Sequence, residues 1–383
     1  MSTPSQPESA RRYSFGPRTL ALLLGLVVAL DVWAMSATDP DFYLPDVFRP
    51  ISLALVVLFA ATGLVRWRWL RRGARILGSV VVVALVLSEL ASRYGDVGDS
   101  HVETTSDRVL RYRYRPGDSV AAGPDHSRRM EINHLGLWDR EYAIPKPPDV
   151  YRILVLSGSI ANDGSIPFES RFHEVLEASL GDTLADGRRI EVINVSCDGW
   201  NTTQQVRMLE LYAMEYEPDF VVVAYMLTSA SIQNGAYRRV GNSFFTFRFL
   251  PLVASLESGS SCSLFAPFHE RYTFDLVVRS ALERLALLRT IHGFRTLVAV
   301  LPVLEEFDDP VCGAIYDRVV ATARESGHDA IRVADAFAGE DVEDYVKPEQ
   351  RLDLCHPNPL GHARIAGALE DAIRGALAEP ATE

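Results

Sequence analysis

The segment Tyr151–Gly164, YRILVLSGSIANDG, is the part of the chain around which the rest is organised. Its branched and aliphatic run Ile153–Leu156 predicts a buried parallel strand, because a strand covered on both faces is apolar at consecutive positions. The run then breaks into Ser157, Gly158 and Ser159, so a hydroxyl is expected at the carboxyl end of the strand. Ligands of open α/β sheets bind at this edge. Ser159 is therefore a candidate nucleophile.

A second segment, Asp353-Leu354-Cys355-His356, supplies the groups that a serine nucleophile needs. A serine hydroxyl is unreactive until a base removes its proton, and the base is often a histidine that a carboxylate orients. The spacing lets the Asp353 carboxylate reach Nδ1 of His356 while Nε2 faces outward. A D-x-x-H alone is more often a helix-start aspartate and a surface histidine. The joint placement of this pair and Ser159 favours catalysis.

From residue 151 onward the sequence alternates strand and helix patterns, which predicts a parallel, doubly wound α/β sheet. Candidate strands are Arg152–Leu156, Ile190–Val195, Phe220–Tyr225, Thr296–Leu301 and Ala330–Val333. Candidate helices are Phe168–Leu180, Thr203–Tyr216, Phe274–Leu288, Ala314–Glu325 and Pro359–Leu377. The interval from about residue 231 to 294 is too long for a simple connection, so an insertion over the carboxyl edge of the sheet is expected.

The first 92 residues read as a membrane domain. Three nearly unbroken apolar runs, each about as long as a bilayer-spanning helix, follow one another through short loops. They are Thr19–Ser36, Ile51–Arg66 and Ile76–Ala91. Residues 93–150 are polar and read as a linker with an irregular lead-in, and residues 151–383 form the α/β domain with its insertion.

The charges of the loops predict the orientation. Arginines precede the first span and separate the second from the third, whereas the first loop is mainly acidic. The amino terminus is therefore expected in the cytoplasm, and three spans place the α/β domain outside. The lipid bilayer is thus an expected partner. The formal net charge of −12 argues against nucleic acid. No His or Cys spacing predicts a metal, and no cofactor is implied.

Four strings together resemble the conserved blocks of the SGNH hydrolases, the GDSL-type esterases and lipases. They are RILVLSGS, INVSCDGWNTTQQ, EPDFVVVAYMLTS and DLCHPNPLGHARIA. The lead-in NHLGLWDREYAIPKPPDVYRIL is also similar to that of membrane-anchored bacterial members, although Trp138 replaces their arginine. The resemblance implies a flavodoxin-like three-layer fold and a triad of Ser159, Asp353 and His356. It implies location in the bacterial inner membrane, with the catalytic domain periplasmic or extracellular.

The resemblance also implies an oxyanion hole, and here the match is partial. The glycine of the second block falls on Ser196, and the asparagine of the third block falls on Thr228. The backbone N–H of Ser196 and the hydroxyl of Thr228 or Ser229 are the candidate donors that remain. Asn162 and Asn234 are further candidates by proximity in sequence alone.

The four cysteines allow three pairings. Because the resemblance brings Cys197 and Cys355 beside the site, a bridge between them is expected, with Cys262–Cys312 as the second bridge. A cysteine nucleophile is the less favoured interpretation.

Two functions remain open from the sequence. The first is a membrane-anchored serine esterase or O-acyltransferase that acts on an acylated glycan or lipid of the cell envelope, with a membrane acyl-transfer protein as a candidate partner. The second is a catalytically degenerate protein of the same fold that binds glycan or lipid or scaffolds a membrane assembly. The missing oxyanion residues favour the second, and the retained triad favours the first.

Overall fold

The computed structural model describes residues 101–122, 128–181, 183–184, 186–231, 260, 262, 265–270, 274–305, 307–347, 353 and 355–378. All of them belong to the unit Leu85–Glu383. The three expected membrane helices, Asn234 and much of the expected insertion lie outside these ranges. Within the ranges, no helix has both the length and the apolar character needed to cross a bilayer.

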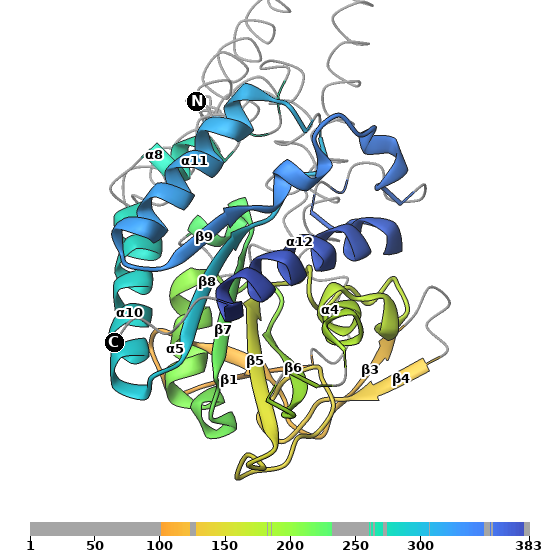
Figure 1. Cartoon of the computed structure of the whole chain (residues 1–383), viewed down its shortest axis with the longest axis vertical. Helices are drawn as coiled ribbons and strands as arrows, with labels where there is room; N and C mark the ends of the chain where they lie inside the picture. The colour runs from red at the N-terminus through yellow and green to blue at the C-terminus, as the bar shows by residue number, and fades with distance from the viewer. Residues whose placement is uncertain are drawn as a thin grey trace, which may run out of the picture. The chain divides into compact units, whose positions relative to one another are not determined.

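Five parallel strands form the central sheet in the order β6-β5-β7-β8-β9 (Figure 1). They are β5 (Val150–Ser157), β6 (Arg189–Ser196), β7 (Phe220–Tyr225), β8 (Arg295–Val300) and β9 (Asp329–Arg332). All five expected strands are confirmed with small differences at their ends. Strand β5 lies between β6 and β7, with Leu156 level with Val195 and Val223. This order brings the carboxyl ends of three strands together at one edge.

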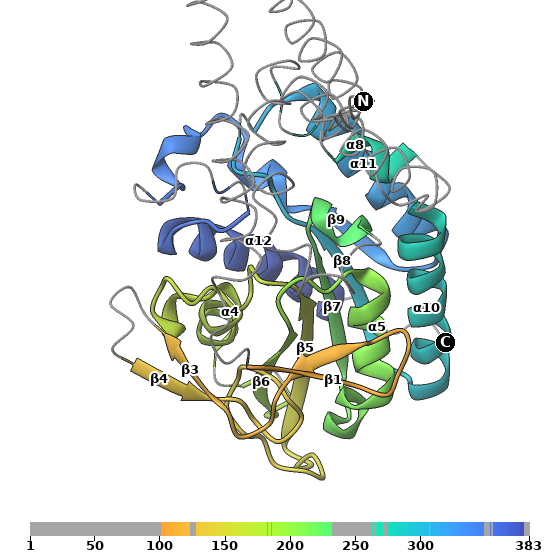
Figure 2. The same cartoon turned by 180° about the vertical axis from the view of Figure 1, so that it is seen from behind.

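Alternate side chains of the sheet enter two separate cores. Leu154 and Leu156 pack in one core, and Ile153 and Val155 pack in the other. The first core is closed by α5 (Thr202–Leu211), α10 (Ser280–His292) and α11 (Pro310–Glu325), and the second by α4 (Phe172–Leu180) and α12 (Pro359–Ala378) (Figures 1 and 2). The predicted three-layer α/β architecture is therefore correct for the described domain.

Short helical elements connect the layers. They are η1 (Phe168–Ser170), η2 (Ala213–Tyr216), η3 (Leu227–Ala230), α8 (Ala266–Glu270), the π-helical turn η7 (Asp275–Arg279), η8 (Val333–Phe337) and η9 (Val342–Asp344).

The segment expected to be an irregular lead-in is instead ordered structure that packs on the domain. It forms two antiparallel pairs, β1 (Val102–Thr104) with β2 (Tyr112–Tyr114) and β3 (Ser119–Ala122) with β4 (Arg128–Glu131). The indole N–H of Trp200 donates to the carbonyl of Tyr112 at 3.0 Å. Tyr112, Trp138 and Trp200 all lie in the first core, so this segment is an integral part of the α/β domain.

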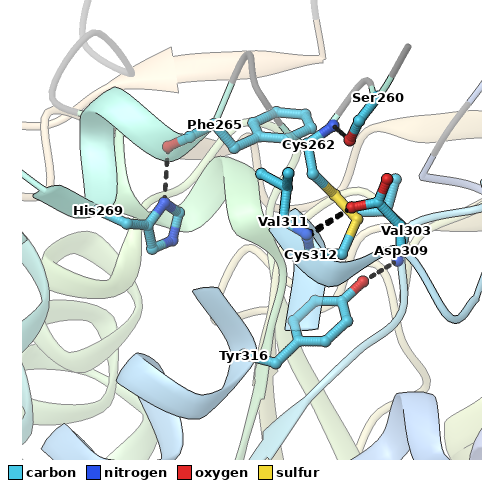
Figure 3. Close-up of a disulfide and its surroundings, with 9 residues drawn as sticks. All are labelled: Ser260, Cys262, Phe265, His269, Val303, Asp309, Val311, Cys312 and Tyr316. Carbon is cyan, nitrogen blue, oxygen red and sulfur yellow. Dashed lines mark hydrogen bonds between the residues drawn. A yellow bond between two sulfur atoms is a disulfide. The ribbon is translucent and has the colours of Figure 1, made fainter. Parts of the chain in front are cut away.

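A disulfide between Cys262 and Cys312 joins the insertion to the start of α11 (Figure 3). Asp309 caps this helix, because its carboxylate accepts the backbone N–H groups of Val311 and Cys312. Close by, His269 accepts from the hydroxyl of Tyr225 at 2.8 Å and donates to the carbonyl of Phe265 at 2.8 Å. The described part of the insertion is therefore anchored both to α11 and to the end of β7.

Candidate active site

Ser159 lies in the turn that follows β5 at the carboxyl edge of the sheet. The turn is closed by backbone bonds from Ala161 to Gly158 and from Asn162 to Ser159, at 3.3 and 3.0 Å. Ser159 is partly exposed, whereas the whole of β5 before it is buried. A rigid buried strand thus holds a reachable hydroxyl.

The structure brings Ser159, His356 and Asp353 into one hydrogen-bonded chain. Nε2 of His356 lies 2.8 Å from Oγ of Ser159, and its Nδ1 lies 2.8 and 2.9 Å from the two carboxylate oxygens of Asp353. Asp353 also accepts the backbone N–H groups of Cys355 and His356 at 2.9 and 3.1 Å. The carboxylate is therefore held by its own loop, and it keeps the Nδ1–H tautomer that leaves Nε2 free to accept the serine proton.

The ionisation of the pair suits this arrangement. Burial alone would lower the pKa of His356, but its hydrogen bond to Asp353 and the charge of that carboxylate outweigh burial and raise this pKa. Burial would likewise raise the pKa of Asp353, but the hydrogen bond to His356 holds it below its usual value. Asp353 thus stays ionised and stabilises the imidazolium that forms when His356 takes a proton.

Ser196 does not occupy the position that the sequence suggested for the oxyanion glycine. It is the last residue of β6, fully buried, and pairs with Ser157, two residues before the nucleophile. The turn comes later than expected and contains Gly199, whose φ of +76° favours glycine. A Cβ placed on Gly158 would lie 3.7 Å from the carbonyl oxygen of Trp200, so this turn is next to the nucleophile loop. The D-G-W sequence after the strand was the available signal for it.

The start of α5 fixes the shape of that turn. Asn201 accepts the backbone N–H of Gln204 at 2.9 Å, and the Gln204 side chain accepts the N–H of Asn201 at 3.2 Å. This capping box ends the turn and begins the helix. Gly199 rather than Ser196 is therefore the residue of the second block that lies in the turn at the carboxyl edge.

Thr228 and Ser229 both follow β7, at the same sheet edge, but they differ in exposure. The short helix η3 leaves Thr228 exposed and buries Ser229. The carbonyl of Ser229 accepts the hydroxyl of Thr202 on α5 at 3.1 Å. Among the described contacts, no hydrogen bond joins either side chain to Ser159 or His356. Thr228 is thus the more accessible of the two hydroxyls.

Asn162 belongs to a buried polar network rather than to an open donor position. Its side-chain oxygen accepts from the amide of Asn194 at 2.7 Å. Its own amide faces the hydroxyl of Tyr114 at 3.4 Å and the carboxylate of Asp198 at 3.5 Å. Burial raises the pKa of Asp198, and this carboxylate is close enough to His356 for their charges to interact. Neither Asp198 nor Tyr114 was recognised from the sequence.

The expected bridge between Cys197 and Cys355 is wrong, because both cysteines are free. Cys197 points into the core under α5, whereas Cys355 packs against the core under α4 and α12, on the other face of the sheet. Burial raises the pKa of Cys355 to about 12 and that of Cys197 well above its usual value. Thiols with such pKa values are poor nucleophiles at neutral pH.

One cluster of potential metal ligands lies away from Ser159, formed by Asp139, His173 and Glu174. Its carboxylates already have partners. Asp139 accepts backbone N–H groups from Asn194 and Arg140 at 2.7 Å each, and Glu174 pairs with Arg140 at 3.0 Å. These contacts link the lead-in to β6 and α4.

Comparisons with known proteins come from solved structures, since no protein-family model and no functionally curated protein matches the chain. TesA is similar with 15% identity and a TM-score of 0.38, over 58% of this chain and 98% of TesA. The psychrotrophic esterase EstA from Pseudoalteromonas sp. is similar with 15% identity and a TM-score of 0.36, over 60% and 99%. Axe2, an acetylxylan esterase from Geobacillus stearothermophilus, is similar with 16% identity and a TM-score of 0.38, over 58% and 94%.

Ser159 follows the first strand of the parallel sheet, and Asp353 and His356 precede its last helix. The three side chains meet at the carboxyl edge. The described domain therefore has the three-layer α/β fold and the serine, histidine and aspartate arrangement that the resemblance to the SGNH hydrolases implied.

Proposed function

We propose that the protein is a membrane-anchored, extracytoplasmic serine esterase or O-acyltransferase that acts on an acylated glycan or lipid of the cell envelope. The observation that carries the proposal is the contact of 2.8 Å between Oγ of Ser159 and Nε2 of His356, with Asp353 on the other imidazole nitrogen. This chain of contacts is what activates a serine toward an acyl carbonyl.

The reaction has two halves. His356 takes the proton as Ser159 Oγ attacks the carbonyl carbon, and the charge on the carbonyl oxygen is stabilised by backbone N–H groups of Ser159 and Gly199. The tetrahedral intermediate then collapses, the bond to the alcohol breaks, and His356 returns its proton to the departing oxygen. An acyl-serine remains. Water deacylates it in a hydrolase, and the hydroxyl of a second glycan or lipid deacylates it in a transferase.

Features outside the triad support the proposed substrate class and location. The three apolar runs of the first 92 residues favour a substrate at the membrane or in the envelope. The disulfide between Cys262 and Cys312 is typical of an oxidising compartment, which agrees with a domain outside the cytoplasm. A membrane acyl-transfer partner would supply the donor if the protein is a transferase.

The second candidate is a catalytically degenerate binding protein of the same fold. It is favoured by the exposed Thr228 at the position of the third-block asparagine, and by the amide of Asn162, which already faces Tyr114 and Asp198. Loss of one oxyanion donor typically slows catalysis about 10²-fold to 10³-fold. A site with too few donors would still bind an acylated ligand.

The test is ester hydrolysis by the full-length protein in mild detergent, with p-nitrophenyl esters of increasing acyl length. We expect turnover by the wild type and a loss of at least about 10⁴-fold in Ser159→Ala. Ser179→Ala is the matched control, because that hydroxyl donates to a carbonyl of its own helix at 3.1 Å and lies outside the candidate site. Turnover that survives in Ser159→Ala, or a folded wild type that only binds, would reject the enzyme proposal.

An added acceptor separates the two enzyme classes. In a hydrolase the acyl group goes to water, so acetylated glycan does not accumulate when glycan is supplied. In a transferase the same addition diverts the acyl group from water to the glycan hydroxyl, which mass spectrometry detects as an increase in acetylated product.

A further inference from the structure

A buried ion pair joins the nucleophile segment to the segment that carries the acid and the base. Nζ of Lys347 donates to the carboxylate of Asp163 at 2.6 Å and to the hydroxyl of Ser165 at 2.7 Å. Asp163 follows Ser159 by four positions, and Lys347 precedes Asp353 by six. Lys347 is only 4% exposed and Asp163 only 6%, so water screens their contact weakly.

The nucleophile segment is organised around Asp163. Its carboxylate accepts both the backbone N–H and the hydroxyl of Ser165, at 2.9 and 2.6 Å, which closes the turn that follows the nucleophile. Its carbonyl accepts Nε of Arg171 at 3.1 Å. Lys347 contacts two groups of this turn at once, so its ammonium group fixes the turn relative to the loop of Asp353 and His356.

The stability of the fold does not explain why such a pair is present. Burial of two charges costs solvation, and replacing a buried ion pair by apolar side chains of similar size is often neutral or stabilising. A position next to the reacting groups offers a different reason, because the distance between Ser159 and His356 depends on how the two segments are held.

The charges of Asp163 and Lys347 also act on His356. The charged or titratable groups whose charges interact with His356 are Asp353 on its own loop, Asp163 and Lys347 of the ion pair, Asp198 after β6, and His362 on α12. The charge of Asp163 raises the pKa of His356, and the charge of Lys347 lowers it. In the intact pair these opposing contributions offset each other.

We propose that Lys347 is a positioning residue, which clamps Asp163 and Ser165 so that Ser159 and His356 stay at reacting distance, and which balances the charge of Asp163 at the base. The inference rests on the proposed function. It assigns to Lys347 no contact with the substrate, since its ammonium group bonds to Asp163 and Ser165.

The test compares Lys347→Met and Asp163→Asn in the full-length protein. A displacement of reacting groups by about 1 Å can slow a reaction about 10²-fold, so we expect each variant to lose about 10-fold to 100-fold in kcat with little change in KM. The pH profiles should move in opposite directions. Removal of the lysine charge raises the pKa of His356 and moves the acidic limb of kcat/KM to higher pH, and removal of the aspartate charge moves it to lower pH.

Three further variants keep the result interpretable. Lys347→Met combined with Asp163→Asn removes both charges of the ion pair, so it should melt closer to the wild type than either single variant, return the acidic limb toward its original pH and still show a low kcat. Lys347→Arg should recover part of kcat. Lys146→Met is the control, because Lys146 makes a similar ion pair with Asp219 at 2.7 Å beside the start of β7, at the opposite sheet edge. It should leave kcat and the pH profile unchanged.

A purely structural role of Lys347 would lower the melting temperature but leave the pH profile of the remaining activity unchanged, or move it in the same direction in both single variants. Either result would overturn the inference. Failure of the proposed function is a separate result, because it removes turnover from the wild type itself while an NMR titration of His356 still reports the two opposite shifts in its pKa.

Discussion

His356 can accept a proton from Ser159 only while its imidazole is neutral. Because the hydrogen bond and charge of Asp353 outweigh burial, the folded protein raises the pKa of His356 above its usual value. The fraction of competent enzyme therefore falls as the pH drops through that raised pKa. We predict that kcat/KM for a neutral ester rises with pH along a single limb whose midpoint lies above about 6.5, the usual pKa of histidine.

The variant Asp353→Asn tests the cause of this shift. The amide removes the charge that raises the pKa of His356 and can hold the imidazole in the wrong tautomer, so kcat should fall about 10⁴-fold. The limb of the residual activity should move to lower pH. A limb that stays in place would mean that Asp353 does not set the ionisation of His356.

The triad and the ion pair of Asp163 and Lys347 differ in how easily they are recognised from the sequence. Asp353 and His356 are three positions apart, and Ser159 follows an obvious strand by two residues, so these residues are recognisable by spacing. Asp163 and Lys347 are 184 positions apart, and neither belongs to a motif. The pair can be recognised only from the fold, which brings the two segments together at one edge of the sheet.

The lead-in is fastened to β6 through Asp139, whose carboxylate accepts the backbone N–H of Asn194 in the middle of the strand at 2.7 Å. It also accepts the N–H of Arg140, and burial raises its pKa to about 7. Asp139→Ala leaves the buried N–H of Asn194 and the partly buried N–H of Arg140 without this acceptor. We predict a loss of about 2–4 kcal/mol in the free energy of unfolding, measured by urea denaturation.

The free energy of unfolding that Asp139→Ala removes should depend on pH. The folded pKa of Asp139 lies above its unfolded value, so its contribution to stability is full below the unfolded pKa and is lost as pH rises through about 7. The penalty of Asp139→Ala should therefore be larger at pH 5 than at pH 8. Asp149→Ala, which removes an exposed ion pair with Arg189 at 3.2 Å, should change stability by less than about 1 kcal/mol at either pH.

The strands of the central sheet were predictable because each is a buried run of branched residues, as Phe220–Tyr225 illustrates. The strands of the lead-in were not, because Tyr112–Tyr114 is only three residues long and mixes tyrosine with arginine. Its burial depends on Trp200, which is far away in sequence. The sequence placed the turn after β6 too early for a related reason, since β6 continues one residue beyond its apolar pattern before the turn of Gly199.

The disulfide closes a large loop of the chain, because Cys262 and Cys312 are 50 positions apart. A crosslink of this span restricts the unfolded chain, which typically stabilises a protein by about 2–4 kcal/mol. We predict that replacing both cysteines by alanine lowers the free energy of unfolding by this amount. Dithiothreitol should destabilise the wild type equally and have no effect on the double variant.

Cys355→Ser provides the control for this experiment, since Cys355 is free and lies beside the base. It should keep the sensitivity of the wild type to the reductant. If dithiothreitol left the melting temperature of the wild type unchanged, the disulfide would not contribute to the stability of the folded protein. The sequence alone could not choose this pairing, because the pairing depends on which face of the sheet each cysteine enters.

The whole molecule combines a basic, apolar first segment with an acidic α/β domain in which Ser159 contacts His356. The most direct measurement is reaction of the full-length protein with a fluorophosphonate, followed by mass spectrometry of the modified peptide. We predict one adduct, on Ser159, which is absent from Ser159→Ala and strongly reduced in His356→Ala. A folded wild type that forms no adduct, or an adduct that persists in Ser159→Ala, would contradict the assignment of an active serine at this site.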